Sequence, residues 1–137
     1  MFTIKPAPLE DAIKVHQQIP EFDRAISLVH LQQRLQRRPF LCLVAYVENQ
    51  PVGYKLGYQQ SADTFYSWLG GVIPSMRKVG VAQSLLEQQQ TWARAQGYRH
   101  LTVKSMFKYP NMLKLLERNG YKQTGFEDAK LSFSKPL

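Results

Sequence analysis

A change of hydrophobic period at Pro74 constrains the fold more than any other feature of the sequence. Residues 64–73, which precede it, are rich in the aromatic and β-branched residues typical of strands. Apolar residues then recur every three or four positions across residues 81–93, and Gly97 is placed to end that helix. Residues 100–105 are again strand-like. This strand, helix and strand predict two parallel strands joined by a crossover, which is almost always right-handed.

The segments around this unit predict further strands and helices. Residues 41–47 and 52–58 are β-rich runs joined by a short polar turn, which indicates an antiparallel hairpin. The other expected elements are a strand over residues 2–5, helices over residues 9–18, from 21 or 22 to 37 and 110–119, and a closing hairpin of residues 121–126 and 129–133. No repeat or linker divides the chain, so we expect one α/β domain over residues 1–137 with a mixed, mostly antiparallel sheet.

The composition excludes several classes of protein. The chain has 137 residues, of which 44% are hydrophobic, so it can bury a core and is neither disordered nor collagen-like. Its longest apolar run, residues 40–47, is too short to cross a bilayer as a helix, and the first residues lack the apolar stretch of a secretory signal. We therefore expect a cytoplasmic protein with no membrane partner.

The cysteine and histidines suggest no metal or disulfide chemistry. Cys42 is the only cysteine and lies inside an apolar run, which predicts a buried small side chain. His16, His30 and His100 are far apart and show none of the spacings of zinc ligands. We expect no bound metal.

The positive charge is concentrated in one half of the chain. The 18 Lys and Arg against 10 Asp and Glu give a net charge of +8. Residues 1–70 hold seven basic and six acidic residues, whereas residues 71–137 hold eleven and four. Such a bias fits a polyanionic ligand, whether nucleic acid, a membrane surface or a phosphorylated cofactor, and equally a basic face kept for solubility. No recognised RNA- or DNA-binding motif accompanies the charge, so we expect no nucleic-acid partner.

Residues 70–82 form the segment with the clearest chemical meaning. They connect a strand end, with Gly70 and Gly71, to the start of the most regular helix. A helix start offers backbone N–H groups without internal partners, and glycine lets a phosphate approach the main chain. The chain contains neither G-x-G-x-x-G nor G-x-x-x-x-G-K-[ST], which disfavours dinucleotide and P-loop sites.

This segment resembles the pyrophosphate loop of the GNAT superfamily of N-acetyltransferases. The family pattern [QR]-x-x-G-x-[GA] is matched by residues 77–82, with Val72 and Pro74 at the usual spacing before it. Residues 115–121, LLERNGY, resemble the family segment L-Y-E-[KR]-x-G-F. The resemblance implies a central sheet of about seven strands with about four helices on both faces. It also implies an acyltransferase that moves an acetyl group from acetyl-CoA to a primary amine by direct attack.

The resemblance implies a set of cofactor-binding residues for coenzyme A. The N–H groups of Val79, Gly80, Val81 and Ala82 would hold its pyrophosphate, and Arg77 and Lys78 would add charge. The main chain at Gly71, Val72 and Ile73 would pair with the pantetheine arm like an added strand.

The proton carriers are where the sequence departs from the family. The tyrosine that often protonates the leaving thiolate falls on Leu116, which leaves Tyr109 as a candidate acid or as a packing residue. The strand of residues 64–73 carries no carboxylate, so Glu21 and Asp23 are the candidate bases, with helix capping or solvation as their alternative roles.

We expect the acceptor to be a small-molecule or peptide amine, and Tyr58, Tyr66 and Trp68 are candidates to line its groove. The missing tyrosine also leaves open a non-catalytic acyl-CoA-binding or sensing module. A monomer and a homodimer are both compatible with the sequence.

Overall fold

In a computed structural model that describes residues 1–137, seven strands form one sheet in the order β1-β2-β3-β4-β5-β7-β6. The strands are β1 (Thr3–Pro6), β2 (Phe40–Val47), β3 (Gln50–Ser61), β4 (Thr64–Val72), β5 (His100–Ser105), β6 (Lys122–Glu127) and β7 (Lys130–Pro136). The helices are α1 (Leu9–His16), α2 (Leu28–Leu35), α3 (Val81–Ala95) and α4 (Pro110–Arg118), with a 3₁₀ turn η1 at Pro74–Met76.

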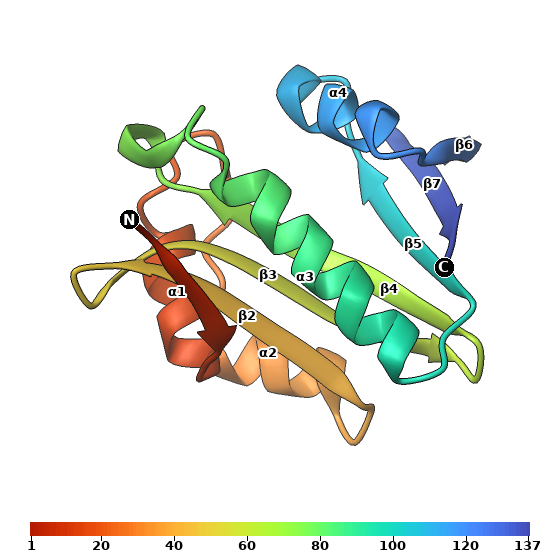
Figure 1. The fold of residues 1–137 in the computed structure, drawn as a ribbon, viewed down its shortest axis with the longest axis horizontal. Coiled ribbons are helices and arrows are strands. Elements are labelled where there is room, and N and C mark those ends of the chain that lie inside the picture. The colour runs from red at the N-terminus through yellow and green to blue at the C-terminus, as the bar shows by residue number, and fades with distance from the viewer.

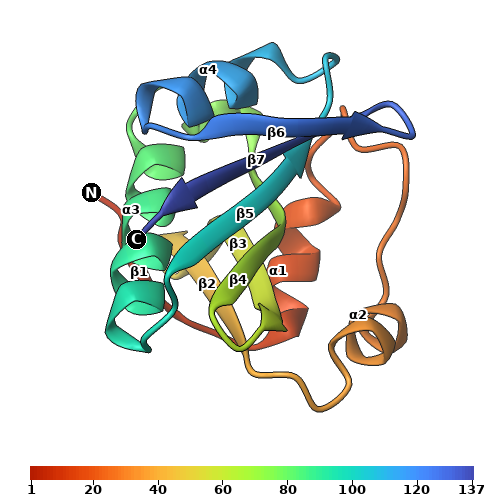
Figure 2. The same ribbon diagram turned by 90° about the vertical axis from the view of Figure 1, so that its right-hand side faces the viewer.

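The helices cover both faces of the sheet (Figures 1 and 2): α1 and α2 pack on one face, and α3 and α4 on the other. Each face has its own core, one of 16 buried residues on the α3 side and one of 11 on the α1 side. The expected mixed, mostly antiparallel sheet with helices on both faces is confirmed. No helix is both long enough and apolar enough to span a lipid bilayer.

The predicted crossover is present. β4 and β5 are parallel from Thr64 opposite His100 to Ser67 opposite Val103, and α3 connects them. All other neighbouring strands are antiparallel. Gly97, with φ +93°, follows the end of α3 in the left-handed region that glycine adopts without a steric penalty.

The helix expected from residue 21 or 22 to 37 is wrong in its first part, because only Leu28–Leu35 is helical. Ser27 caps this shorter helix, since its side chain accepts the N–H of His30 at 3.1 Å. Residues 17–27 form a loop instead, in which the Phe22 ring packs on His16 with ring centroids 4.6 Å apart. Tertiary contacts therefore override the apolar spacing that suggested a longer helix.

Candidate active site

A notch opens where β4 and β5 part. β5 pairs with β4 only as far as Ser67, whereas β3 follows β4 to Val72 (Figure 1). A β-bulge at Trp68 marks the change, because Leu56 lies opposite Leu69 and Gly57 opposite Ser67. The second half of β4 consequently has one free edge.

The backbone alternation shows which groups this edge offers. The Ile73 N–H points to β3 and donates to the Val52 carbonyl at 2.9 Å. Because successive residues of a strand direct their N–H and C=O groups to opposite sides, Gly70 and Val72 present theirs to the notch. The N–H groups of both residues and the carbonyl of Gly70 can hydrogen-bond to an extended ligand laid along β4. The Val72 carbonyl accepts a hydrogen bond from Arg77 Nε.

The turn after β4 carries unpaired donors. The N–H groups from Lys78 to Gln83 find no acceptor within the chain. Gly80 precedes α3 with φ +91°, and a Cβ placed there would have no atom within 4 Å. The turn is thus solvent-exposed and directs free donors outward at the positive end of a helix dipole, which is the geometry of an anion site. The residues expected to form the cradle, 79–82, are among those that carry these unpaired donors.

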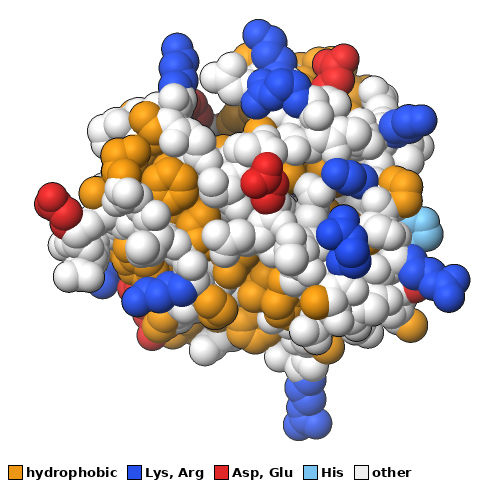
Figure 3. All heavy atoms as spheres, in the orientation of Figure 1, with side chains coloured by type: hydrophobic (Ala, Val, Ile, Leu, Met, Phe, Trp, Pro, Cys, Tyr) orange, Lys and Arg blue, Asp and Glu red, His pale blue; other side chains and the backbone are white.

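The two basic residues of this turn differ in their surroundings. Arg77 is engaged: its Nη1 and Nη2 lie 2.6 and 3.1 Å from the carboxylate oxygens of Glu21, and its Nε donates to the Val72 carbonyl at 3.1 Å. Lys78 is exposed and forms no ion pair. Lys78 is therefore the cation of this turn that is free to meet a phosphate. On the face that carries α3 and α4, Figure 3 shows more Lys and Arg than Asp and Glu side chains.

The loop of residues 17–27 bridges the two sides of the notch. Glu21 reaches the end of β4 through Arg77, while Asp23 accepts a hydrogen bond from Lys108, just before α4, at 2.8 Å. The loop is thereby attached to both sides of the notch, to the segment after β4 and to the segment before α4. These contacts lower the pKa of both carboxyls, through the hydrogen bond from Arg77 for Glu21 and from Lys108 for Asp23. A lowered pKa makes each carboxylate a weaker proton acceptor.

Tyr109 is also part of this bridge. It stands at the start of α4, half-buried, with its ring edge-on to Phe22 at a centroid distance of 5.9 Å. Leu116, in the place of the family tyrosine, is 1% exposed and belongs to the core on the α3 side. Leu116 can supply packing but no proton.

The three candidate acceptor residues lie together on the opposite face of the sheet from α3. The Tyr58 ring meets those of Tyr66 at 5.4 Å and Trp68 at 5.7 Å. Arg34 of α2 lies over Trp68 at 5.0 Å and donates to the Tyr58 hydroxyl at 3.1 Å. Tyr66 also lines a small hollow of about 130 Å³ that reaches β5, β6 and β7. Tyr58 is 4% exposed and so acts as a support, whereas Tyr66 and Trp68 are only partly buried.

One residue near the notch was missed in the sequence. Lys55 lies in the middle of β3 and is 7% exposed. In the sequence, Lys55 interrupts an otherwise apolar run between Gly53 and Gly57. A lysine flanked in this way inside a predicted strand is the feature that would have indicated a buried cation.

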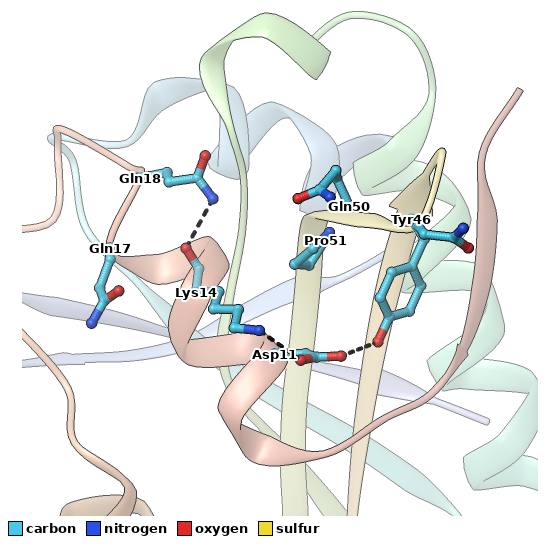
Figure 4. A pocket seen from close by; sticks show the side chains of 8 residues that line it. Asp11, Lys14, Gln17, Gln18, Tyr46, Gln50 and Pro51 are labelled. Atoms are coloured by element: carbon cyan, nitrogen blue, oxygen red, sulfur yellow. Dashed lines mark hydrogen bonds and ion pairs between the residues drawn. The ribbon is translucent and has the colours of Figure 1, made fainter.

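A second hollow, of about 480 Å³, lies elsewhere, between α1 and the β2–β3 hairpin (Figure 4). Its one carboxylate is already engaged, since Asp11 accepts the Tyr46 hydroxyl at 2.5 Å and lies 3.8 Å from Lys14. It contains none of the free backbone donors of the notch. The notch is therefore the better candidate for the active site.

The profile of the acetyltransferase (GNAT) family matches residues 8–121. The chain belongs to the GNAT acetyltransferase family. The match spans β4, the Gly80 turn and α4, so it includes the elements that build the notch. Among curated proteins, none matches the sequence.

Solved structures of this fold superpose on nearly the whole chain. The ribosomal-protein-S18-alanine N-acetyltransferase of Escherichia coli has a TM-score of 0.85 at 16% identity, covering 100% of this chain and 94% of its own. The GNAT domain of Streptomyces lividans PAT has 0.82 at 19%, covering 98% and 89%. The PaiA N-acetyltransferase of Thermoplasma acidophilum, solved with coenzyme A, has 0.82 at 12%, covering 100% and 99%. At these identities the likeness establishes the fold.

Proposed function

We propose that this protein transfers the acetyl group of acetyl-CoA to a primary amine of a small molecule or peptide. One observation carries the proposal: the unpaired N–H groups from Lys78 to Gln83 lie at the end of a strand whose edge is free. A diphosphate on the turn and an extended arm along β4 would together satisfy both sets of donors. Acetyl-CoA, the acyl donor of the family, has both parts.

Different residues of the notch would bind different parts of acetyl-CoA. The N–H groups of Val79, Gly80, Val81 and Ala82 would hold the pyrophosphate, with the ammonium of Lys78 beside them. The main chain of Gly70 and Val72 would hold the pantetheine arm. Gly71 and Ile73, which were also expected to pair with it, direct their N–H groups to β3 instead. An N–H group facing the notch would also polarise the thioester carbonyl and stabilise the negative charge that develops on its oxygen.

The acceptor side of the proposal rests on the aromatic residues. The amine would approach past Tyr66 and Trp68 and attack the thioester carbon directly, with loss of CoA as the leaving thiol. An amine with a pKa of roughly 10.4 is mostly protonated at pH 7, so it must first give up a proton. Glu21 and Tyr109 stay candidates for proton transfer, although the ion pair with Arg77 makes Glu21 a weak base.

A pair of variants at Gly80 tests the cofactor site. Gly80→Glu places bulk and negative charge where the phosphates would sit, so we expect no detectable CoA binding by calorimetry. Gly80→Ala is the matched control, because its methyl group meets no atom within 4 Å and it adds only the strain of φ +91°, roughly 1–2 kcal/mol. Unchanged CoA affinity in folded Gly80→Glu would refute the placement.

A thiol-release assay separates the enzyme from a non-catalytic acyl-CoA sensor. The protein is incubated with acetyl-CoA and a panel of amines, and free CoA is measured with a thiol reagent. Burial raises the pKa of the Cys42 thiol to about 12, so the protein itself contributes little signal. Amine-dependent release supports the enzyme, whereas tight acetyl-CoA binding without release for any amine supports the sensor.

A further inference from the structure

The side chain of Lys55 is 7% exposed, and its ammonium lies close to the free edge of β4. Gly53 and Gly57, two residues to either side on β3, both face α3: a Cβ on Gly53 would lie 2.9 Å from Val81, and one on Gly57 would lie 3.1 Å from Gln89. Since every second residue of a strand shares a face, Lys55 also points to the α3 side. Burial of a charged amine here requires a reason beyond packing.

Gly70 is what lets Lys55 reach the notch. The two residues lie opposite each other on β3 and β4. A Cβ on Gly70 would lie 3.6 Å from the Cγ of Lys55 and 3.7 Å from its Nζ. Gly70 therefore places no side chain of its own between the Lys55 ammonium and the strand edge that it presents to the notch.

Nothing in the chain neutralises this cation. Lys55 Nζ forms no ion pair and no hydrogen bond. The side chains that face it from the surrounding elements do not ionise; they are Leu43 of β2, Ser67 of β4, and Leu85 and Gln89 of α3. Burial alone lowers the pKa of Lys55 to about 8.

The polar surroundings of Lys55 are also incomplete. Both amide atoms of Gln89, a residue that is 0% exposed, lack a partner. Ser67, at the last pair between β4 and β5, is 3% exposed on the same face as Lys55. Lys55, Ser67 and Gln89 are thus three largely buried polar residues on the α3 side of the sheet, near the point where β4 and β5 part, and the hydrogen-bonding groups of Lys55 and Gln89 are left unpaired.

We propose that Lys55 binds the sulfur of coenzyme A and gives it a proton when the thioester breaks. This inference rests on the proposed function and deepens it, because it supplies the acid that Leu116 cannot. A leaving thiolate is an anion. The Lys55 ammonium lies beside the strand edge and has no counter-ion, so its charge is complementary to that of the thiolate. The proton affinities are also matched, since a free thiol has a pKa of roughly 8.5.

The acceptor nitrogen uses its lone pair to bond the carbonyl carbon, and the carbon–sulfur bond breaks with its electron pair on sulfur. Lys55 passes one Nζ proton to that sulfur, which gives neutral lysine and CoA thiol. The acceptor nitrogen then loses a proton to water, and Lys55 regains one from solvent.

The test compares Lys55→Met with Lys114→Met, an exposed lysine of α4, as the matched control. We expect Lys55→Met to lower kcat roughly 100-fold or more, with little change in the KM for acetyl-CoA. The fall of the wild-type kcat at alkaline pH, as Lys55 loses its proton, should disappear in this variant. Wild-type kcat in Lys55→Met would overturn the proposal.

A binding experiment tests Lys55 without turnover. Wild-type protein should bind CoA at least roughly tenfold more tightly than desulfo-CoA near pH 8.5, where half of a free thiol is ionised. Lys55→Met should lose this preference, and Lys55→Arg should keep it while staying slow, because a guanidinium holds its proton. An equal preference in wild type and Lys55→Met would refute the sulfur contact.

The two proposals fail in different ways. In one outcome, Gly80→Glu binds neither CoA nor desulfo-CoA, but the preference for CoA over desulfo-CoA is the same with and without Lys55. This outcome would support the proposed cofactor site and refute only the role of Lys55. Binding that survives Gly80→Glu would instead refute the cofactor site itself. If no amine is acetylated, the comparison of CoA with desulfo-CoA alone decides on Lys55.

Discussion

Glu21 and Arg77 are 56 positions apart in the sequence and form a two-point ion pair across one wall of the notch, with the shorter contact at 2.6 Å. The pair fixes the loop of residues 17–27 to the end of β4. It also cancels a positive charge directly beside the Gly80 turn. The same contact therefore organises the loop and limits the charge available to a phosphate.

Glu21→Gln separates these two effects. The amide cannot neutralise Arg77, so the guanidinium is free to turn toward an anion, and we expect CoA to bind several-fold more tightly at low salt, as measured by calorimetry. The gain should shrink when salt is raised to roughly 0.5 M, because a surface charge is screened there. A kcat loss of roughly 100-fold with unchanged binding would instead identify Glu21 as the base.

Gly57 holds β3, β4 and α3 at their observed spacing. A Cβ there would lie 2.5 Å from the Phe65 ring and 2.6 Å from the Tyr66 carbonyl oxygen. Because the second neighbour is backbone, it cannot rotate away, and Gly57→Ala should destabilise the fold by about 1–3 kcal/mol. Gly125→Ala, where a Cβ meets nothing within 4 Å, is the control. Equal urea midpoints for the two variants would contradict this packing.

The sequence predicts local periodicity well and long-range contacts poorly. The crossover from β4 through α3 to β5 was predictable because the period changes at Pro74 and Gly97 ends the helix. The Gly80 turn was predictable because its glycine and the following helix are contiguous. The loop of residues 17–27 was not, since its conformation depends on Arg77 and Lys108, which are distant in the sequence.

The same limit applies to the site. Tyr58, Tyr66 and Trp68 could be grouped because they lie on two predicted strands that follow each other in the sequence, and the register of β3 and β4 brings them together. The relation of Lys55 to Gly70 depends on the exact register of β3 and β4 and on the bulge at Trp68. A bulge shifts which side chains share a face, and no pattern in the sequence fixes its position.

Leu116 tests whether the position of the family tyrosine is structural in this chain. It is 1% exposed in the core on the α3 side, so Leu116→Ala should cost about 2–5 kcal/mol in urea unfolding. Leu116→Met, which conserves volume, should cost less than about 1.5 kcal/mol. Turnover per folded molecule should change little in either variant. A stable Leu116→Ala with abolished turnover would show that this side chain takes part in the reaction.

The dependence of stability on pH isolates the buried charge of Lys55. Its pKa is about 8 in the folded protein, against 10.5 as the ordinary value. Between these values the unfolded chain binds more protons than the folded one, so the contribution of Lys55 to the free energy of unfolding rises with pH. Below pH 8 the folded state carries the full penalty of the buried ammonium, which amounts to about 3 kcal/mol.

Lys55→Met removes this penalty without leaving a cavity, because methionine fills most of the same volume. We expect the variant to be more stable than wild type at pH 7, by up to about 3 kcal/mol in urea unfolding, and this gap should narrow steadily toward pH 10. Tyrosines with raised pKa values weaken both proteins alike at high pH, so the difference between them cancels that effect. Lys114→Met should show no such gap at any pH. The difference in the free energy of unfolding between Lys55→Met and wild type could instead stay constant from pH 7 to 10. That result would mean that Lys55 keeps its ordinary pKa in the folded protein because its ammonium is in contact with water.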